Sequence, residues 1–155
     1  MKKDDVADLK TREQMDDALD KYIEYYESLT RRSIRLIEKI ADPQMRFRDP
    51  FNDVSGLTAF EEIMSKMFED VENPSFKVID KSWGQDGMTA YIKWHFTCGS
   101  SSDPRLITGM SEVVFAPYNA LVVSHKDYWD AAENVYEKIP VLGGIIRLIK
   151  SRIAI

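Results

Sequence analysis

The stretch Met45-Arg46-Phe47-Arg48-Asp49-Pro50-Phe51, followed by Gly56, decides the fold that this sequence predicts. Side chains in an extended strand alternate between two faces, so Met45, Phe47 and Asp49 share one face and the two arginines lie on the other. We expect the apolar face to turn inward and to take Asp49 with it. A buried carboxylate is unfavourable unless it is paired, neutral or used in chemistry. Asp49 is therefore the first candidate for a functional residue.

Length and composition limit the classes of protein to which the chain can belong. Its 155 residues predict one domain, which can bury about 70% of the surface of the unfolded chain and so enclose a cavity. The formal net charge of -5 argues against a nucleic-acid binder. The single cysteine, Cys98, excludes an intrachain disulfide and favours a reducing compartment. With no signal-like segment and no long apolar run, a cytoplasmic protein is expected.

Apolar residues at helical spacing predict helices before and after the 45–51 stretch. Each of the two longer helices is expected to begin at a capping box, Thr11 with Gln14 and Thr58 with Glu61. The predicted helices cover residues 11–29, 34–40 and 58–71.

From residue 75 onward the apolar period changes to two, which is typical of strands. Short turns separate the predicted strands, which cover residues 75–83, 89–98, 105–115 and 120–129. Successive strands joined by short turns predict an antiparallel meander. The fold class is therefore α+β, with N-terminal helices packed on an antiparallel sheet.

This order of elements resembles the cone-shaped fold of nuclear transport factor 2 (NTF2) and its relatives, which include ketosteroid isomerases, limonene epoxide hydrolases and SnoaL-like polyketide cyclases. The resemblance is carried by the 47–51 motif, by Gly56 and by the strand end His125-Lys126-Asp127-Tyr128-Trp129-Asp130. It implies a strongly curved sheet around a cavity for a small hydrophobic molecule. It also implies a homodimer through the outer sheet face, where Tyr91, Lys93 and His95 are compatible with a subunit contact.

The ketosteroid isomerase branch suggests roles for particular residues. The resemblance implies Asp49 as general base and Tyr25 as the hydroxyl that stabilises a developing oxyanion. The second acid of those isomerases falls on Ser111 in this sequence, and the neighbouring Glu112 lies on the opposite strand face. Steroid isomerisation is therefore not implied, and a SnoaL-like activity remains open. His125 is a third catalytic candidate because histidine transfers protons near neutral pH.

Other side chains are candidates for binding a ligand in the cavity, each with a structural alternative. Asp49 can instead accept backbone N–H groups in a turn. His125 and Asp127 can form either an orienting pair or a polar strand end. Neither histidine has a partner at metal-ligand spacing, so we expect no metal and no cofactor. The candidates for substrate contact are Tyr22, Phe47, Met64, Phe68, Trp94, Ser111, Asp127 and Trp129.

The C-terminal segment has its own pattern. Asp130 with Glu133 predicts a last helix, which Pro140 and Gly143-Gly144 are expected to break. The chain thus divides into a mobile N-terminus at 1–10, the NTF2-like domain at 11–139 and an amphipathic basic tail at 140–155. The tail can pack against the domain or a partner subunit, which the acidic chain favours, or lie on an anionic membrane surface.

The function expected from the sequence is binding of a small hydrophobic molecule, with proton transfer of the isomerase or cyclase type by Asp49. The first alternative is a non-catalytic ligand-binding or dimerisation module of the same fold. The further alternative is a peripheral membrane protein that uses residues 141–155.

Overall fold

The computed structural model describes residues 9–135 and 140–153. The predicted mobile segment 1–10 therefore lies mostly outside the described residues. The elements are, in chain order, α1 (Arg12–Glu27), the 3₁₀ helix η1 (Ile34–Lys39), β1 (Ala41–Arg48), β2 (Asp53–Ser55), α2 (Leu57–Asp70), β3 (Ser75–Trp83), β4 (Thr89–Ser100), β5 (Asp103–Phe115), β6 (Val122–Trp129), α3 (Ala131–Asn134) and α4 (Pro140–Ile153).

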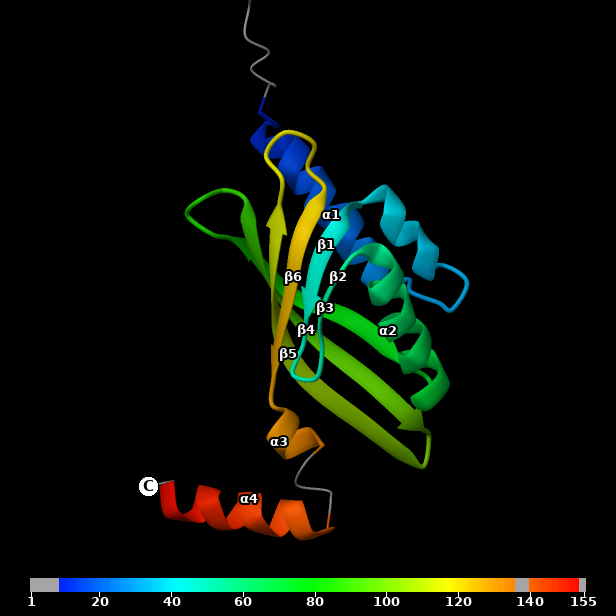
Figure 1. Ribbon diagram of the computed structural model, residues 1–155, viewed down its shortest axis with the longest axis vertical. Coiled ribbons are helices and arrows are strands. Elements are labelled where there is room, and N and C mark those ends of the chain that lie inside the picture. The colour runs from blue at the N-terminus through cyan, green and yellow to red at the C-terminus, as the bar shows by residue number, and fades with distance from the viewer. Residues whose placement is uncertain (1–8, 136–139, 154–155) are drawn as a thin grey trace, which may run out of the picture.

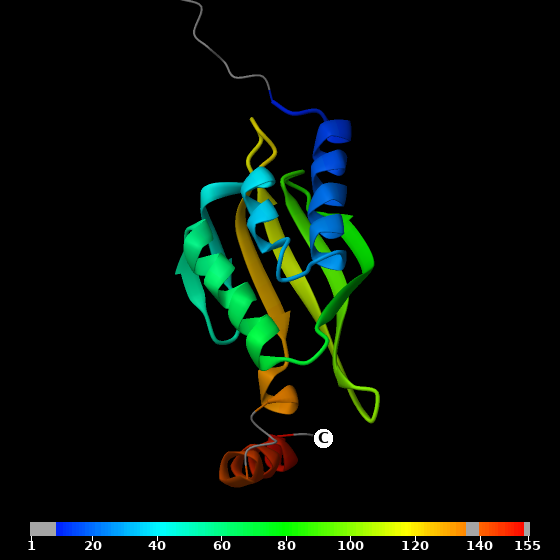
Figure 2. The same cartoon turned by 90° about the vertical axis from the view of Figure 1, so that its right-hand side faces the viewer.

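The strands form one curved, open sheet in the order β2-β1-β6-β5-β4-β3. Helices α1, η1 and α2 cover its concave face, while none of the described helices lies along the convex face (Figures 1 and 2). The α+β class and the NTF2-like arrangement predicted from the sequence are confirmed. The meander from β3 to β6 is antiparallel as expected, but β1 pairs with β6 in parallel.

Helix α1 is attached to the sheet by its apolar side and at its rim. Thr11 and Gln14 form the predicted capping box, and Met15, Leu19, Tyr22 and Tyr25 are buried. Polar contacts then join the helix to β3: Trp83 Nε1 donates to Asp16 Oδ1 over 2.7 Å, and Lys81 pairs with Asp20. These contacts fix the position of the tyrosines that α1 directs into the cone.

The core fills the space between the helices and the concave face of the sheet. Its largest fully buried side chains come from α1, β1, α2 and β5, and include Tyr22, Phe47, Phe60 and Phe115. The strand alternation seen in the sequence places Ala90, Ile92 and Trp94 of β4 on this inner side. Because only two polar residues, Ser111 and His125, are classed as buried in the described chain, they indicate where a site can lie.

Three local predictions were wrong. Strand β1 ends at Arg48, so Asp49 lies in the following turn and does not follow Met45 and Phe47 into the core. Helix α2 begins at Leu57 after Gly56, whose φ of 93° favours glycine, and no side chain caps it at Thr58. Helix α4 begins at Pro140, since proline is tolerated in a first turn, and continues through the glycine pair at 143–144.

Candidate functional site

A chain of hydrogen-bonded side chains runs across the inside of the cone and links α1 to three strands. The Tyr22 hydroxyl lies 2.8 Å from His125 Nδ1, and His125 Nε2 lies 2.7 Å from Asp127 Oδ1. Ser111 Oγ donates to the same Asp127 oxygen, and Trp94 Nε1 donates to Ser111 Oγ over 2.8 Å. Burying polar side chains costs free energy that apolar side chains at the same positions would not cost. A continuous chain of polar side chains inside the cone therefore indicates a role beyond packing.

Register brings these residues together. Every second residue of a strand points to the same face of the sheet, so His125 and Asp127 both point to the concave side. The pairing of β5 with β6 sets Ser111 opposite Asp127, and the pairing of β4 with β5 sets Trp94 opposite Gly109. Trp94 can lie flat over that position because glycine has no side chain there, which lets its indole nitrogen reach Ser111.

Burial determines the charge state of Tyr22 in this chain. Desolvation raises the pKa of Tyr22 far above its ordinary value, so this phenol keeps its proton. When the Tyr22 hydroxyl donates to Nδ1, the hydrogen of the imidazole is on Nε2, which then donates to Asp127; the direction of both bonds depends on the tautomer of His125. His125 is only 3% exposed, and the rings of Phe47 and Tyr26 lie 5.1 and 5.4 Å from its own. Two hydrogen bonds and the neighbouring aromatic rings thus hold His125, which in turn orients Asp127.

Asp127 is the member of the chain that solvent or a ligand can reach. Its side chain is 18% exposed, whereas that of His125 is 4% exposed. The bonds from His125 and Ser111 both end on Oδ1, so Oδ2 accepts neither of them. A carboxylate that is oriented through one oxygen and partly exposed can exchange a proton.

Tyr26 adds an unused donor beside this chain. Its hydroxyl is buried and has no hydrogen-bond partner in the described residues. Burial raises its pKa well above the ordinary value, and the charges of Tyr22 and Asp127 act in the same direction. The hydroxyls of Tyr22 and Tyr26 shift each other's pKa, although the two do not form a hydrogen bond. A buried, protonated and unpartnered hydroxyl is a suitable donor for a ligand oxygen.

The structure separates the three residues to which the sequence assigned catalysis. Asp49 Oδ1 accepts the backbone N–H groups of Phe51 and Asn52, each over 2.7 Å, so this carboxylate fixes the turn after β1. The Tyr25 hydroxyl donates to the Ile34 carbonyl over 2.8 Å and ties α1 to η1. Both ring nitrogens of His125 bind other partners, Tyr22 and Asp127.

The candidates for substrate contact fall into three groups. Tyr22, Trp94, Ser111 and Asp127 belong to the polar chain. Phe47 and Met64 are buried in the core, where Phe47 packs against Phe60 with ring centroids 5.3 Å apart. Trp129 and Phe68 are partly buried near the open end, and the Trp129 ring packs against Phe51.

Sequence reasoning missed the aromatic wall contributed by β3. Phe76 contacts the rings of Tyr26 and Phe96, with centroids 5.5 and 4.7 Å away. The alternation of Phe76 and Val78 in β3 was a usable signal for this inner face.

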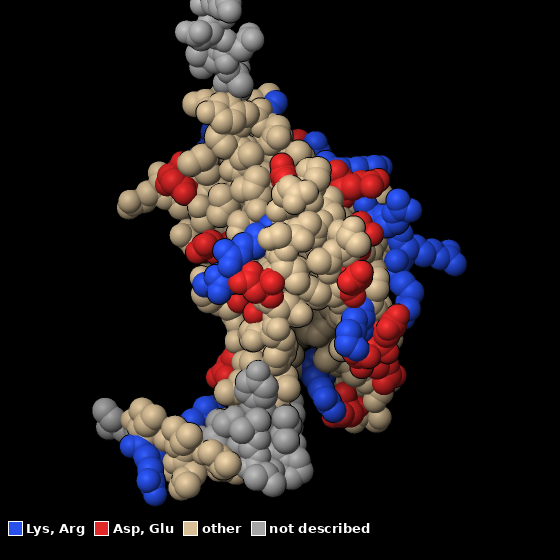
Figure 3. Space-filling view, viewed as in Figure 1, with Lys and Arg blue, Asp and Glu red and all other residues tan. Residues whose placement is uncertain are grey.

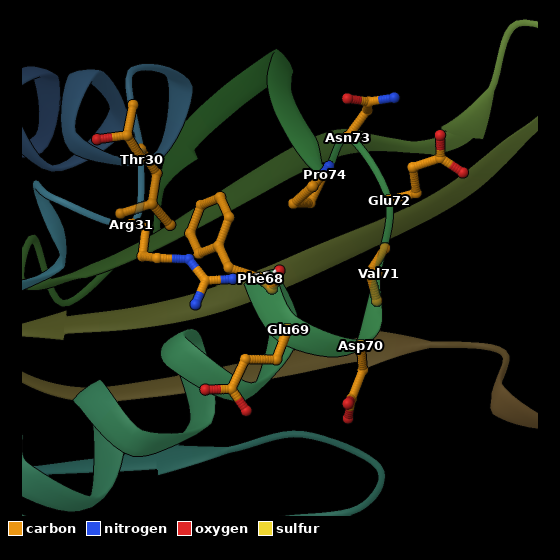
Figure 4. Close-up of a pocket in the computed structure, with 10 residues that line it drawn as sticks. Thr30, Arg31, Phe68, Glu69, Asp70, Val71, Glu72, Asn73 and Pro74 are labelled. Atoms are coloured by element: carbon orange, nitrogen blue, oxygen red, sulfur yellow. Dashed lines mark hydrogen bonds between the residues drawn. The ribbon is translucent and has the colours of Figure 1, made fainter.

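A groove of about 680 Å³ lies where the end of α2 meets the segment after α1. Phe68 and Pro74 line it together with Arg31, whose guanidinium donates to the Phe68 carbonyl over 2.8 Å (Figure 4). The carboxylates of Glu69, Asp70 and Glu72 lie around its edge. Within the described residues, no group of three or more His, Cys, Asp or Glu is placed to hold a metal ion.

N-terminal helices packed on the concave face of an open, curved sheet place the protein in the NTF2-like class of folds. Residues 22–125 match the profile of the SnoaL-like domain, which covers more than half of the chain. The chain belongs to the SnoaL-like domain family. Among curated protein sequences, none matches it significantly.

Solved structures with the same fold are distant in sequence. An NTF2-like protein of unknown function from Burkholderia pseudomallei superposes with a TM-score of 0.65 at 11% identity, over 80% of this chain and 95% of that one. A protein of Jannaschia sp. CCS1, proposed to be a SnoaL-like polyketide cyclase, gives 0.64 at 11% identity over 78% and 88%. A ketosteroid isomerase-like protein of Catenulispora acidiphila, solved with trimethylamine, gives 0.60 at 9% over 74% and 86%. At these identities the likeness establishes the fold alone.

Proposed function

We propose that this chain binds a small hydrophobic molecule inside the cone and moves a proton on it, with Asp127 as the group that takes and returns the proton. The observation that carries the proposal is the hydrogen-bonded chain from Tyr22 to Trp94, in which the bonds from His125 and Ser111 both end on Oδ1 of Asp127 and neither ends on Oδ2. The aromatic wall around it suits an apolar ligand with few polar groups.

The chemistry assigned to each side chain follows its contacts. Asp127 Oδ2 abstracts a proton next to a carbonyl group, and the same oxygen returns it at another position or to another atom. Tyr26, whose hydroxyl has no partner in the described residues, donates a hydrogen bond to the enolate oxygen that forms. His125 and Ser111 are positioning residues, because both bind Asp127 Oδ1 and neither binds Oδ2, the atom proposed to move the proton. The reaction class is isomerase- or cyclase-like acid–base catalysis without a cofactor.

The test compares two aspartates that differ in their place in the fold. In D₂O, α-hydrogens of hydrophobic cyclic ketones should exchange for deuterium faster with the protein than without it, as followed by NMR. Asp127→Asn should reduce that exchange by at least about 100-fold, which is the usual size of a general-base contribution. Asp49→Asn is the matched control, because asparagine keeps an oxygen that can accept the hydrogen bonds of the turn. With this variant the ketone hydrogens should exchange at the wild-type rate.

Each alternative outcome has a definite meaning. Loss of exchange in Asp49→Asn but not in Asp127→Asn would reject the assignment and restore Asp49 as the base. Binding of hydrophobic ligands without exchange in any variant would support the alternative function, a non-catalytic ligand-binding module, in which the polar chain only shapes the cavity.

The proposal also includes a homodimer through the convex face of the sheet. Tyr91, Met110 and Tyr128 are 41%, 47% and 48% exposed on this face, and register places Met110 opposite both Lys93 and Tyr128. No described helix lies along this face of the sheet (Figure 1). Sedimentation equilibrium should give the mass of a dimer, and Met110→Glu should shift it toward the monomer. A monomeric wild-type protein would reject this part.

A further inference from the structure

Helix α4 presents an apolar surface that the described body of the protein does not cover. Ile145, Leu148, Ile149 and Ile153 are 51%, 55%, 51% and 75% exposed. At 3.6 residues per turn these four side chains fall within one stripe about 140° wide. Figure 1 shows the helix beyond α3, apart from the sheet and from the helices that cover the sheet. Exposed aliphatic side chains in a continuous stripe mark an interaction surface.

The charge of this helix is opposite to that of the rest of the chain. Its only ionisable side chains are Arg147, Lys150 and Arg152, which give a charge of +3 over residues 140–153. The whole chain has a net charge of -5, so the remaining residues have -5 - 3 = -8. On α4, Figure 3 shows basic and uncharged residues without an acidic one.

We propose that α4 binds an anionic lipid surface and holds the cone at a membrane. A helix with an aliphatic stripe and basic side chains lies in the interfacial plane, with the stripe at the acyl boundary and the cations near lipid phosphates. Arg152 falls inside the stripe by helical periodicity, and its long stem can follow the apolar surface while the guanidinium reaches the headgroups. No described helix is long and apolar enough to cross a bilayer, so the contact is peripheral.

Pairing of α4 with a second copy of itself explains the same surface less well. Two copies would bring six positive charges together with no acid on either helix to offset them. Like charges at an interface oppose association, whereas an anionic bilayer neutralises each of them. Charge complementarity therefore favours lipid over self-association.

The size of the effect follows from the charge. Each basic side chain near an anionic surface strengthens binding by about fivefold, so three together give roughly 100-fold tighter binding to anionic than to neutral vesicles. Added salt should weaken the binding because it screens this attraction.

The experiment is co-sedimentation of the full chain with vesicles of phosphatidylcholine, with or without phosphatidylserine. The wild type should sediment with the anionic vesicles and stay in solution with the neutral ones. The double change Leu148→Glu, Ile149→Glu should lower binding by at least about 30-fold, since it replaces two buried aliphatic contacts with repelled charges. Leu9→Glu, at a residue before α1 that is 64% exposed, is the matched control and should bind as the wild type does.

Three results would overturn the proposal. The first is equal sedimentation with both kinds of vesicle, and the second is unchanged binding by the α4 double variant. The third is absence of vesicle binding together with self-association that the same double variant abolishes, which would make α4 a protein interface. The urea midpoint of each variant should equal that of the wild type, because every changed residue is exposed. Ketone exchange tests the proposed function separately.

Discussion

Two tyrosines one helical turn apart on α1 offer a direct test of the polar chain. Tyr22→Phe and Tyr26→Phe remove the same atom from two buried side chains of the same helix. The Tyr22 hydroxyl bonds His125 Nδ1 over 2.8 Å, while the Tyr26 hydroxyl has no partner in the described residues. The two variants should therefore differ in stability although their chemistry is identical.

The expected magnitudes follow from hydrogen-bond accounting. Tyr22→Phe leaves a buried ring nitrogen without a partner, which destabilises the fold by about 1–3 kcal/mol. Tyr26→Phe removes a buried hydroxyl that already lacks one, so its effect should lie between about zero and a gain of 1 kcal/mol. For a chain of this length, about 1–3 kcal/mol corresponds to a lowering of the melting temperature by roughly 2–12 °C.

Urea unfolding followed by tryptophan fluorescence measures both variants under the same conditions. The nitrogen chemical shifts of the His125 ring add a second measurement, because loss of the Tyr22 donor should release the histidine from a single tautomer. Equal destabilisation by the two substitutions, or a larger loss from Tyr26→Phe, would refute the hydrogen-bond assignment within the cone.

Further predictions concern packing, pH and capping. Gly109→Ala should destabilise the protein by about 1–3 kcal/mol and change its tryptophan fluorescence, because the new Cβ would lie 2.4 Å from the Trp94 ring. Gly144→Ala is the control and should leave the urea midpoint unchanged, because a Cβ at Gly144 meets no atom within 4 Å. Burial raises the pKa of Tyr22, Tyr25 and Tyr26 above 10.0, so these tyrosines lose their protons in the unfolded state before they do in the folded state. The free energy of unfolding should therefore fall above about pH 10, by up to roughly 1.4 kcal/mol per pH unit for each tyrosine. A urea midpoint that stays constant above that pH would contradict this. Thr11→Ala removes the N-cap of α1 and should lower the unfolding free energy by about 1 kcal/mol, whereas Thr58→Ala, at a residue that caps nothing, should change it by less than about 0.5 kcal/mol.

Sequence periodicity could predict the elements because each depends on neighbours within a few positions. The capping box at Thr11 and the bounds of β3 at Ser75 and Trp83 are of this local kind, and both are confirmed. The turn at Asp49 is also local, but the alternation of residues 45–51 is consistent both with an inward-facing Asp49 in the strand and with an Asp49 in the turn after it. Where a strand stops decides whether an alternating residue points inward, and periodicity does not locate that end.

The polar chain could be predicted only in part. Most of its members appeared as candidates because they alternate onto the inner face of strands. Their connections depend on register between strands, including the irregularity between Val114 and Phe115 that sets Ser111 opposite Asp127. They also depend on which hydroxyl of α1 reaches His125, and helical spacing alone does not distinguish Tyr22, Tyr25 and Tyr26.

The parallel contact between β1 and β6 has a consequence for the nascent protein on the ribosome. Phe47 is aligned with His125, and the hydrogen bond from Tyr22 to His125 spans 103 positions of sequence. The hairpin of β1 and β2 joins the sheet only through β6. While β6 remains in the exit tunnel, helices α1 and α2 have no complete surface to cover, and the buried tyrosines have no histidine to meet. The site is thus the last part of the domain to form. Until β6 emerges, the apolar sides of α1 and α2 are exposed to solvent or bound by a chaperone.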